Sequence, residues 1–272
     1  MGLSSTDFEP WLARWGLEAD GEGFATPYAR NRLLPVRRGA ERAMLKLSRH
    51  EEEQRAAAVM AWWGGEGAAR LLGHEGEATL LERVEGDHSL ASMARSGEDD
   101  AASRILCAVG ERLHAERPAP RPAGLVPLRT WLRALPAAAP QGGIVAEAAA
   151  LAERLLAADE QPCVLHGDLH HGNVLDGGPR GWLAIDPKGI EGPRGYDYAN
   201  ILCNPDPPTA LAPGRFARQA EVVAEAARLP GGRLLEWVFV HAAIAGVWCR
   251  QDGFDDGPAM EIAAMARAAL SA

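Results

Sequence analysis

Cysteine is scarce and widely scattered in this 272-residue sequence. Four cysteines occur, and none forms a C-x-x-C pair with another: Cys107, Cys163, Cys203 and Cys249. Neither a zinc site nor the dense disulfide framework of a small secreted domain has this pattern. We therefore expect reduced, mostly buried thiols.

An excess of positive charge is also absent. The chain carries 28 Lys and Arg residues against 37 Asp and Glu residues, a formal net charge of -9 at pH 7. Because a nonspecific grip on nucleic acid or anionic lipid needs net positive charge, neither partner is expected. A cationic ligand suits this balance better, although mild acidity also serves solubility alone.

Long hydrophobic runs are missing as well. The longest apolar stretch, Leu234 to Cys249, is interrupted by Glu236 and His241. It falls short of the roughly twenty residues that a membrane span needs. Residues 1–20 contain acidic side chains and no apolar stretch typical of a secretory signal. We predict a core helix at 234–249 and a cytoplasmic protein without a membrane partner.

No internal repeat is visible, which excludes solenoids and propellers. Short strands are predicted in the first third of the chain, at 33–36, 43–47, 71–73 and 78–84. A helix is predicted between them, at 51–63. It begins with three glutamates, where the helix dipole favours acids, and it ends at Gly64-Gly65.

Helical periodicity dominates the chain after residue 86. Helices are predicted at 99–116, 128–135, 144–158, 216–229 and 234–249, and short strands at 164–165 and 182–185. This division predicts an α+β fold of two lobes that meet at a cleft. Residues 1–84 would form a β-rich lobe that binds nucleotide, and residues 85–272 a mainly helical lobe for catalysis and acceptor binding.

The most specific stretch is H-G-D-L-H-H-G-N at 166–173, followed by W-L-A-I-D-P at 182–187. Phosphoryl transfer needs a carboxylate for the attacking hydroxyl and oxygen ligands that hold Mg²⁺ on the phosphates. Asp168 and Asn173 have the spacing of Asp and Asn in the kinase loop H-R-D-L-x-x-x-N, and Asp186 ends a strand as the Asp of D-F-G does. These residues predict a kinase.

The loop H-G-D-x-H-x-x-N with a following I-D-P resembles the aminoglycoside phosphotransferase superfamily, relatives of protein kinases with Gly in place of Arg. The stretches 67–73, 165–173 and 180–187 are similar to its streptomycin 6-phosphotransferase branch, the aminoglycoside and hydroxyurea kinases. The resemblance implies a two-lobed protein-kinase-like fold with a small antiparallel sheet and one helix in the N-terminal lobe.

Carried over to this sequence, the resemblance makes Asp168 the catalytic base and Asn173 and Asp186 the Mg²⁺ ligands. It makes His166 a scaffold residue of the loop, with ATP and Mg²⁺ as cofactors. The tandem histidines at 170–171 do not indicate a zinc site, because adjacent side chains point in different directions and no third ligand is suitably spaced.

Nucleotide contacts are expected in the first lobe. Lys46 lies in a strand-like run ahead of the acidic helix start and matches the lysine that contacts the α- and β-phosphates of ATP in kinases. Glu53 is its expected partner, with Glu51 and Glu52 also in reach. By analogy with the family, backbone groups of Glu82 and Val84 would hold a purine edge. No G-x-G-x-x-G loop is present to cover the phosphates.

The acceptor is expected to be a small molecule. Between Asp186 and Tyr196 the sequence has neither an A-P-E element nor a Ser or Thr for an activation-loop phosphosite, which argues against a protein kinase. An acidic acceptor site would suit a cationic substrate. Candidates for its lining are Asp197, Asn200, Asp206, Trp248, Asp252, Asp255 and Asp256.

Some of these candidates have structural alternatives. Residues 252–257 also fit a solvated turn, Trp248 a core aromatic, and Asp197 a carboxylate that fixes the catalytic loop.

The sequence thus predicts an ATP- and Mg-dependent phosphotransferase acting on a small cationic molecule, with an aminoglycoside such as streptomycin as the first acceptor to test. A kinase for a cellular metabolite and a nucleotide-binding pseudokinase remain as alternatives. A monomer and a homodimer are both compatible with the sequence, and so are ATP and GTP as donors.

Overall fold

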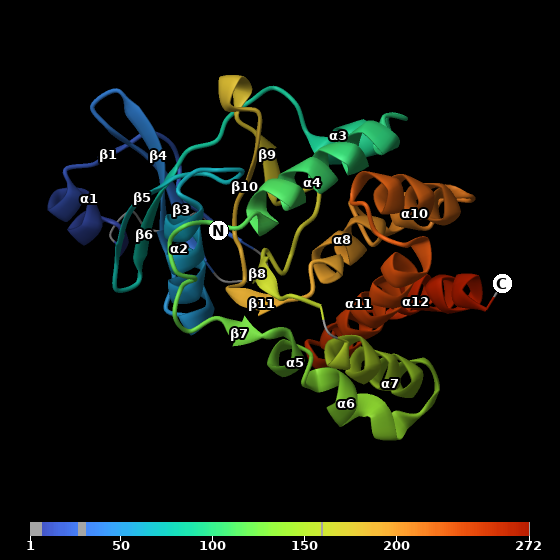
Figure 1. Cartoon of the computed structure of the whole chain (residues 1–272). Coiled ribbons are helices and arrows are strands. Elements are labelled where there is room, and N and C mark those ends of the chain that lie inside the picture. The colour runs from blue at the N-terminus through green and yellow to red at the C-terminus, as the bar shows by residue number, and fades with distance from the viewer. Residues whose placement is uncertain (1–6, 27–30, 159, 272) are drawn as a thin grey trace.

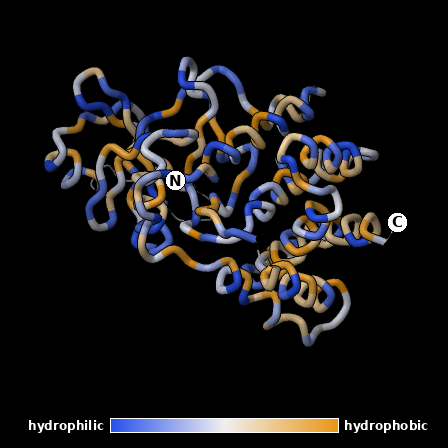
Figure 2. Tube along the Cα trace, in the orientation of Figure 1, coloured by the Kyte–Doolittle hydropathy of each residue, from blue (hydrophilic) through white to orange (hydrophobic). Residues whose placement is uncertain are grey.

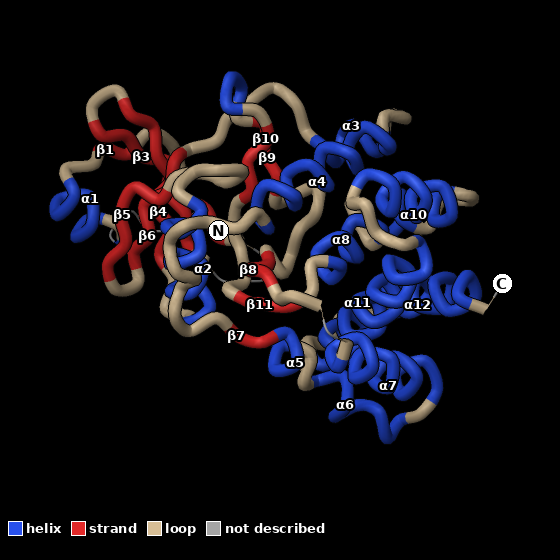
Figure 3. Tube along the Cα trace, viewed as in Figure 1, coloured by secondary structure: helices blue, strands red, loops and turns tan. Residues whose placement is uncertain are grey.

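The strands and the long helices separate into two ends of the molecule. The computed structural model describes residues 7–26, 31–158 and 160–271. A sheet occupies one end and a group of helices the other, with two smaller sheets between them (Figures 1 and 3). This arrangement confirms the α+β class predicted from the sequence.

The N-terminal sheet is antiparallel, with strand order β1-β3-β4-β6-β5 and β2 paired to β3. Its strands are β1 (Glu18–Ala19), β2 (Phe24–Ala25), β3 (Arg32–Arg38), β4 (Glu41–Leu47), β5 (Leu71–Glu75) and β6 (Ala78–Glu82). The four predicted strands are all present. Gly39 and Gly76, with φ of 60° and 57°, form the tight turns after β3 and β5, a conformation that glycine adopts at little cost.

Alternation along β4 decides which side chains enter the cleft. Ala43, Leu45 and Leu47 are buried in a small core with Phe8, which precedes helix α1 (Glu9–Trp15). Since successive strand residues point to opposite faces, Lys46 points to the other face of the sheet.

Helix α2 (Glu51–Trp63) has the predicted bounds. It ends at Gly64, which is left-handed with φ 60° and donates its N–H to the Met60 carbonyl. Met60 and Trp63 belong to the same buried cluster as the C-terminal helices. The indole of Trp63 donates to the Leu113 carbonyl at 3.1 Å. Helix α2 therefore joins the sheet to the rest of the molecule.

The helical end contains more elements than were predicted. Its helices are α3 (Leu90–Arg95), α4 (Asp99–His114), α5 (Leu128–Trp131), α6 (Ala134–Ala138), α7 (Gly143–Ala157), α8 (Gly195–Leu202), α9 (Pro207–Ala210), α10 (Arg215–Ala226), α11 (Gly231–Gln251) and α12 (Gly257–Leu270), with short 3-10 turns η2 (Ala139–Gln141) and η3 (Gly178–Arg180). The single helix predicted at 128–135 is two helices, α5 and α6. We attribute the break to Pro136, which has no N–H to bond the Leu132 carbonyl.

Two small sheets lie between the ends. One is the antiparallel hairpin of β9 (Val174–Asp176) and β10 (Trp182–Ala184). The other has the order β7-β11-β8, with β7 (Val126–Pro127), β8 (Cys163–Leu165) and β11 (Ile190–Gly192). The chain between β8 and β9 carries the H-G-D-L-H-H-G-N stretch.

Helix α11 is the central helix of the C-terminal end. By length and composition alone it could cross a membrane, but 61% of its most apolar window is buried inside the protein. Leu234, Trp237 and Ile244 are fully buried, and the helix packs on α7, α8 and α12. Around it, apolar and polar residues alternate along the helices (Figure 2). These contacts support the predicted core helix.

The four cysteines are free thiols, as expected. Cys107 is buried and the other three are partly buried. Burial raises the pKa of Cys107, Cys163 and Cys203 to about 12, so these thiols are protonated at neutral pH.

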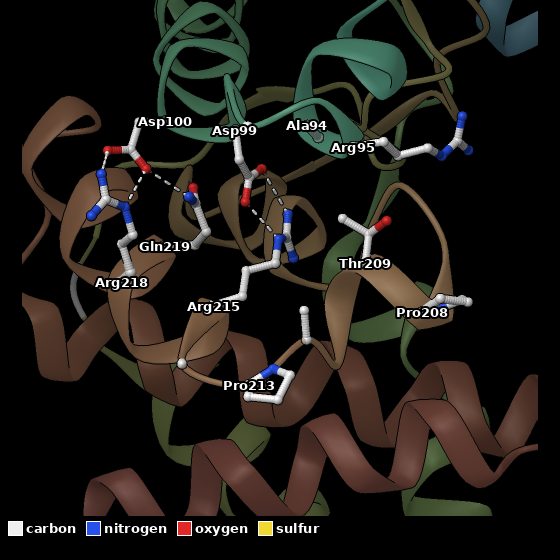
Figure 4. A pocket seen from close by; sticks show the side chains of 13 residues that line it. Ala94, Arg95, Asp99, Asp100, Pro208, Thr209, Pro213, Arg215, Arg218 and Gln219 are labelled. Carbon is white, nitrogen blue, oxygen red and sulfur yellow. Dashed lines mark hydrogen bonds and ion pairs between the residues drawn. The ribbon is translucent and has the colours of Figure 1, made fainter.

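A cavity of about 680 Å³ lies between α3 and α4 on one side and α9 and α10 on the other. Four of its charged residues form two ion pairs within the lining (Figure 4), and the fifth, Arg95, pairs with Asp206 outside it. Arg215 binds Asp99 through two bonds of 2.6 and 3.0 Å, and it also donates to the Asn204 carbonyl at 2.8 Å. One turn along, Arg218 pairs with Asp100 at the surface. We interpret this cavity as a structural joint between helices.

Arg215→Met is expected to lower the free energy of unfolding by about 3–5 kcal/mol, because it leaves the largely buried Asp99 without its partner. Arg218→Met is the matched control on the same helix. Its side chain is 70% exposed, and a loss below about 1 kcal/mol is expected. Urea unfolding followed by circular dichroism measures both, and equal losses would contradict this interpretation.

Candidate active site

Four segments distant in sequence meet beside the N-terminal sheet. Lys46 comes from β4 and Glu53 from α2, while Asn173 and Asp186 flank the open end of the β9-β10 hairpin. Ile185 donates its N–H to the Asn173 carbonyl at 2.9 Å. The hairpin pairing therefore brings Asn173 and Asp186 together, although 13 positions separate them in the sequence.

Lys46 is held by two carboxylates. Its side chain is only 8% exposed, and its Nζ lies 2.6 Å from Glu53 Oε2 and forms a second ion pair with Asp186. Asn31 donates to the other Glu53 oxygen at 2.6 Å. Of the three glutamates left open by the sequence, Glu53 is thus the one that pairs with Lys46.

Asp168 lies at the centre of the loop between β8 and β9. Asn200 donates to its Oδ1 at 3.0 Å and Asn173 to its Oδ2 at 3.2 Å. Burial opposes its ionisation, but His170 and Lys188 more than offset this and hold the pKa of Asp168 below its usual range. The carboxylate is therefore ionised at neutral pH, with 34% of the side chain exposed.

Asp186 is an ionised carboxylate next to two lysines. Burial opposes its charge, but Lys46 and Lys188 lower the pKa of Asp186 to about 2. Its φ of 62° is left-handed, a conformation that Asp tolerates better than most residues with a side chain.

His166 is a fully buried part of the loop. Its Nε2 lies 2.8 Å from the Ile185 carbonyl, and its Nδ1 accepts the Asp168 N–H at 3.2 Å. These partners require the neutral tautomer with the proton on Nε2. Burial lowers the pKa of His166, which agrees with that state.

Asp197 does not face an acceptor. Its side chain is completely buried and accepts the N–H groups of His166 at 2.8 Å and Gly167 at 2.7 Å, and it pairs with His114 at 2.8 Å. Both carboxylate oxygens accept hydrogen bonds, from backbone N–H groups of the loop and from His114 in α4. The expected acceptor contact is therefore wrong, and the alternative of a carboxylate that fixes the loop describes its place.

Asn200 also faces inward. Its amide donates to Asp168, while its Oδ1 accepts from His241 Nε2 at 2.9 Å and from Asn204 Nδ2 at 2.9 Å. Burial lowers the pKa of His241 to about 4, so a neutral imidazole orients the amide. Asn200 thus positions Asp168 in this structure.

Of the other predicted acceptor residues, Trp248 and Asp252 lie near the end of α11 and Asp206 lies at α9. Trp248 is partly buried and packs edge-to-face on Trp131, with ring centroids 5.8 Å apart. Asp252 is exposed at the C-terminal cap of α11. Asp206 caps α9 and pairs with Arg95 at 2.7 Å.

A cavity of about 350 Å³ opens between the N-terminal sheet and the β9-β10 hairpin. Lys46, Asn173 and Asp186 lie in its lining. The rest of the lining is largely apolar and includes Leu33, Met44, Leu81, Val84, Leu175 and Ile185. An apolar cavity whose lining also includes Lys46, Asn173 and Asp186 has the character of a nucleotide site.

The predicted purine contacts are partly available. The Glu82 N–H is used by the Arg70 carbonyl at 2.8 Å, and the Glu82 side chain binds Arg180 and the Arg70 N–H. The Glu82 N–H is therefore not available to a purine. Among the described residues, no hydrogen bond links the Val84 N–H to another group, and this N–H adjoins the cavity.

A match over most of the chain decides the family. Residues 14–253 match the family described as aminoglycoside/hydroxyurea antibiotic resistance kinase. The chain belongs to this family. It is a phosphotransferase with an alcohol group as acceptor.

Two curated relatives are similar along nearly their full length. A streptomycin 3''-kinase from Klebsiella pneumoniae is 44% identical over 247 residues, which cover 89% of this chain and 92% of the relative. A streptomycin 6-kinase from Streptomyces griseus is 32% identical over 257 residues, 88% of this chain and 81% of the relative.

The fold is that of solved aminoglycoside phosphotransferases. One from Streptomyces rimosus aligns with a TM-score of 0.62 at 18% identity, covering 89% of this chain and 98% of its own. The protein-kinase-like fold of this kinase is thereby established.

One residue of the site is absent from the sequence predictions. Lys188 follows Asp186 by two positions, and its Nζ lies 3.4 Å from Glu52, 3.5 Å from Asp186 and 3.6 Å from Asp168. Its place in I-D-P-K, two positions after Asp186, was the available signal.

Within the described ranges, no group of three or more His, Cys, Asp or Glu side chains could hold a metal ion.

Asp197→Asn is expected to lower the free energy of unfolding by about 3 kcal/mol, the worth of a hydrogen bond to a buried charged group. The asparagine side chain keeps one acceptor oxygen, but its NH₂ group is a donor and faces a backbone N–H of the loop, which is also a donor. Faster hydrogen exchange at residues 166–168 should accompany the loss. The control is Asp252→Asn at the exposed cap, where a change within about 0.5 kcal/mol is expected. An unchanged exchange rate in Asp197→Asn would contradict the assigned role.

Proposed function

We propose that this kinase transfers the γ-phosphate of ATP to a hydroxyl of streptomycin or of a similar guanidinylated aminoglycoside. Two observations carry the proposal: Lys46, Asn173 and Asp186 line one cavity, with Asp168 hydrogen-bonded to Asn173, and the chain is 44% identical to a streptomycin kinase. We further propose that the enzyme acts in the cytoplasm, as a monomer or a homodimer.

Lys46 is the residue that we assign to the α- and β-phosphates of ATP. Its ammonium lies at the charged end of the cavity, and Glu53 holds it there. The apolar walls would cover the two faces of the base, and the Val84 N–H and the Glu82 carbonyl would meet its edge. This arrangement supports ATP as donor without deciding against GTP.

Asn173 and Asp186 are the side chains that would hold Mg²⁺. An amide oxygen and an ionised carboxylate are ligands that Mg²⁺ prefers, and it keeps waters and phosphate oxygens in its other positions. The donor set therefore fits, and both residues line the nucleotide cavity. When bound, the ion would neutralise charge on the phosphates.

Asp168 is the proposed base. Asn200 and Asn173 fix its two oxygens, and its partly exposed side chain leaves a way open for the acceptor. It would orient the attacking hydroxyl and take up its proton as the oxygen bonds to phosphorus. The lowered pKa keeps the carboxylate ready to accept.

The acceptor is proposed to be cationic. The net charge of -9 would draw a guanidinylated sugar toward the protein, and Asp252 and Trp248 remain as candidate contacts near the end of α11. The relative at 44% identity is named for the 3'' position and the one at 32% for position 6. We therefore take the 3'' hydroxyl as the first position to examine.

Asp168→Asn is expected to reduce transfer by about 10²–10⁴-fold, the usual contribution of a general base, with little change in ATP affinity. Asp186→Ala should instead weaken binding of ATP in the presence of Mg²⁺. Steady-state kinetics and calorimetric titration separate the two effects. Activity of Asp168→Asn within a few fold of the parent would refute the assigned role.

Streptomycin is expected to stimulate ADP release and to gain the mass of one phosphate. Hydroxyurea and choline, offered in parallel, test a second acceptor of the family and a metabolite. If another compound of the panel is the better acceptor, the streptomycin proposal is wrong. If ATP with Mg²⁺ binds and no acceptor stimulates turnover, the pseudokinase alternative is favoured.

A further inference from the structure

Lysine is almost absent from this chain. Of 28 Lys and Arg residues, only Lys46 and Lys188 are lysines, and all other basic residues are arginines. Both lysines lie at the active site and both pair with Asp186. A lysine ammonium is a compact point charge, whereas an arginine guanidinium is a wide planar group. These two positions therefore favour the compact charge.

Lys188 differs from Lys46 in what it reaches. Lys46 pairs with Glu53 and Asp186, on the side of the nucleotide cavity. The Lys188 Nζ lies 3.5 Å from Asp186 and 3.6 Å from Asp168, with 17% of the side chain exposed. The Lys188 ammonium therefore lies between Asp186, on the donor side, and Asp168, on the acceptor side.

The local backbone is built to hold Lys188 there. Its N–H donates to the His166 carbonyl at 2.8 Å, which ties it to the catalytic loop. Gly167 has a φ of 81°, and a Cβ at that position would lie 3.0 Å from Lys188 Cβ and 2.9 Å from Ile190 Cδ1. The glycine of H-G-D, where protein kinases have arginine, thus leaves room for the stem of Lys188.

A third contact fixes the ammonium from the N-terminal side. Glu52 in α2 approaches it at 3.4 Å, one residue before the partner of Lys46. Neighbouring glutamates of one helix therefore each hold one lysine.

We propose that Lys188 is a further catalytic residue, whose ammonium binds the phosphoryl group as it passes from ATP to the acceptor. The inference rests on the proposed roles of Asp168 and Asp186. A phosphoryl group in transit must cross between the hydroxyl at Asp168 and the phosphates at Asp186. The Lys188 ammonium lies within 3.6 Å of both carboxylates, so it can contact the phosphoryl group throughout the transfer.

The step balances without a change in Lys188. The acceptor oxygen forms a bond to the γ-phosphorus while the bond from that phosphorus to the β-γ bridging oxygen breaks. The hydroxyl proton goes to Asp168, and ADP leaves. Lys188 keeps its protons and donates hydrogen bonds to the phosphoryl oxygens, where charge is carried in the transition state.

Lys188→Met is expected to lower kcat by about 10²–10³-fold, the usual effect of removing one such donor. It should also weaken ATP binding at least about tenfold more than ADP binding, since only ATP carries the γ-phosphate. Calorimetric titration of both nucleotides with Mg²⁺ needs no acceptor. A failed search for the acceptor therefore leaves this test intact.

A purely structural role predicts a different result. In that case Lys188 would only neutralise the surrounding carboxylates, and Lys188→Met combined with Glu52→Gln would recover kcat together with the melting temperature. The proposal predicts that the double variant recovers stability without recovering kcat. Lys188→Arg, which keeps the charge, should retain more activity than Lys188→Met.

A labelling experiment covers the case in which these variants do not fold. An ATP analogue with an acyl group on its γ-phosphate transfers that acyl group to a nearby amine, and peptide mass spectrometry of the parent enzyme identifies the lysine. Labelling at Lys188 that ATP suppresses is expected. Labelling confined to Lys46, or equal losses of ATP and ADP affinity in Lys188→Met, would overturn the proposal.

Discussion

The ion pairs that Lys46 and Lys188 form with the surrounding carboxylates hold the site of this protein together. Lys46 and Lys188 bring together acidic groups from α2, from the loop after β8 and from the strand end after β10. Without the ammonium groups, these carboxylates would repel one another in a poorly solvated place. With them, Asp168 and Asp186 stay ionised, which is the state that metal binding and proton acceptance both need. The same ion pairs join the N-terminal sheet to the catalytic loop.

The remaining elements fix the positions of the side chains in this charged cluster. The β9-β10 hairpin sets Asn173 against Asp186, and the buried Asp197 clamps the loop through two backbone N–H groups. From the other side, His241 and Asn204 orient Asn200, which in turn holds Asp168. Asp197, Asn200 and Asp168 each have defined partners in this network, which favours one arrangement of the loop. In the proposed reaction, this loop would present the Asp168 carboxylate to the acceptor.

Much of this could be predicted from the sequence, because the informative residues are local. Strand alternation, the glutamate-rich start and Gly64 end of α2, and the spacing within residues 166–186 gave the fold class and the central residues. Helix α8 was not predicted because all eight of its residues are buried, so it has no amphipathic period. Strands β9 and β11 are three residues each, too short for a periodic signal.

The acceptor residues were harder to predict for a physical reason. Asp197 and Asn200 are polar side chains in a short helix, and composition alone cannot tell a substrate contact from a buried clamp. Only the partners decide: loop N–H groups for Asp197, and Asp168 and His241 for Asn200. Lys188 was missed because its contacts include Asp168 and Glu52, which are distant from it in sequence and adjacent in space.

The most direct test of the central claim is a crystal structure with Mg²⁺, a non-hydrolysable ATP analogue and streptomycin. The account predicts that Asn173 and Asp186 ligate the ion and that Lys46 contacts the α- and β-phosphates. It also predicts that Asp168 accepts a hydrogen bond from one streptomycin hydroxyl, in line with the γ-phosphorus. A complex in which Asp168 faces away from the acceptor, or in which the ion is held by other side chains, would contradict the account.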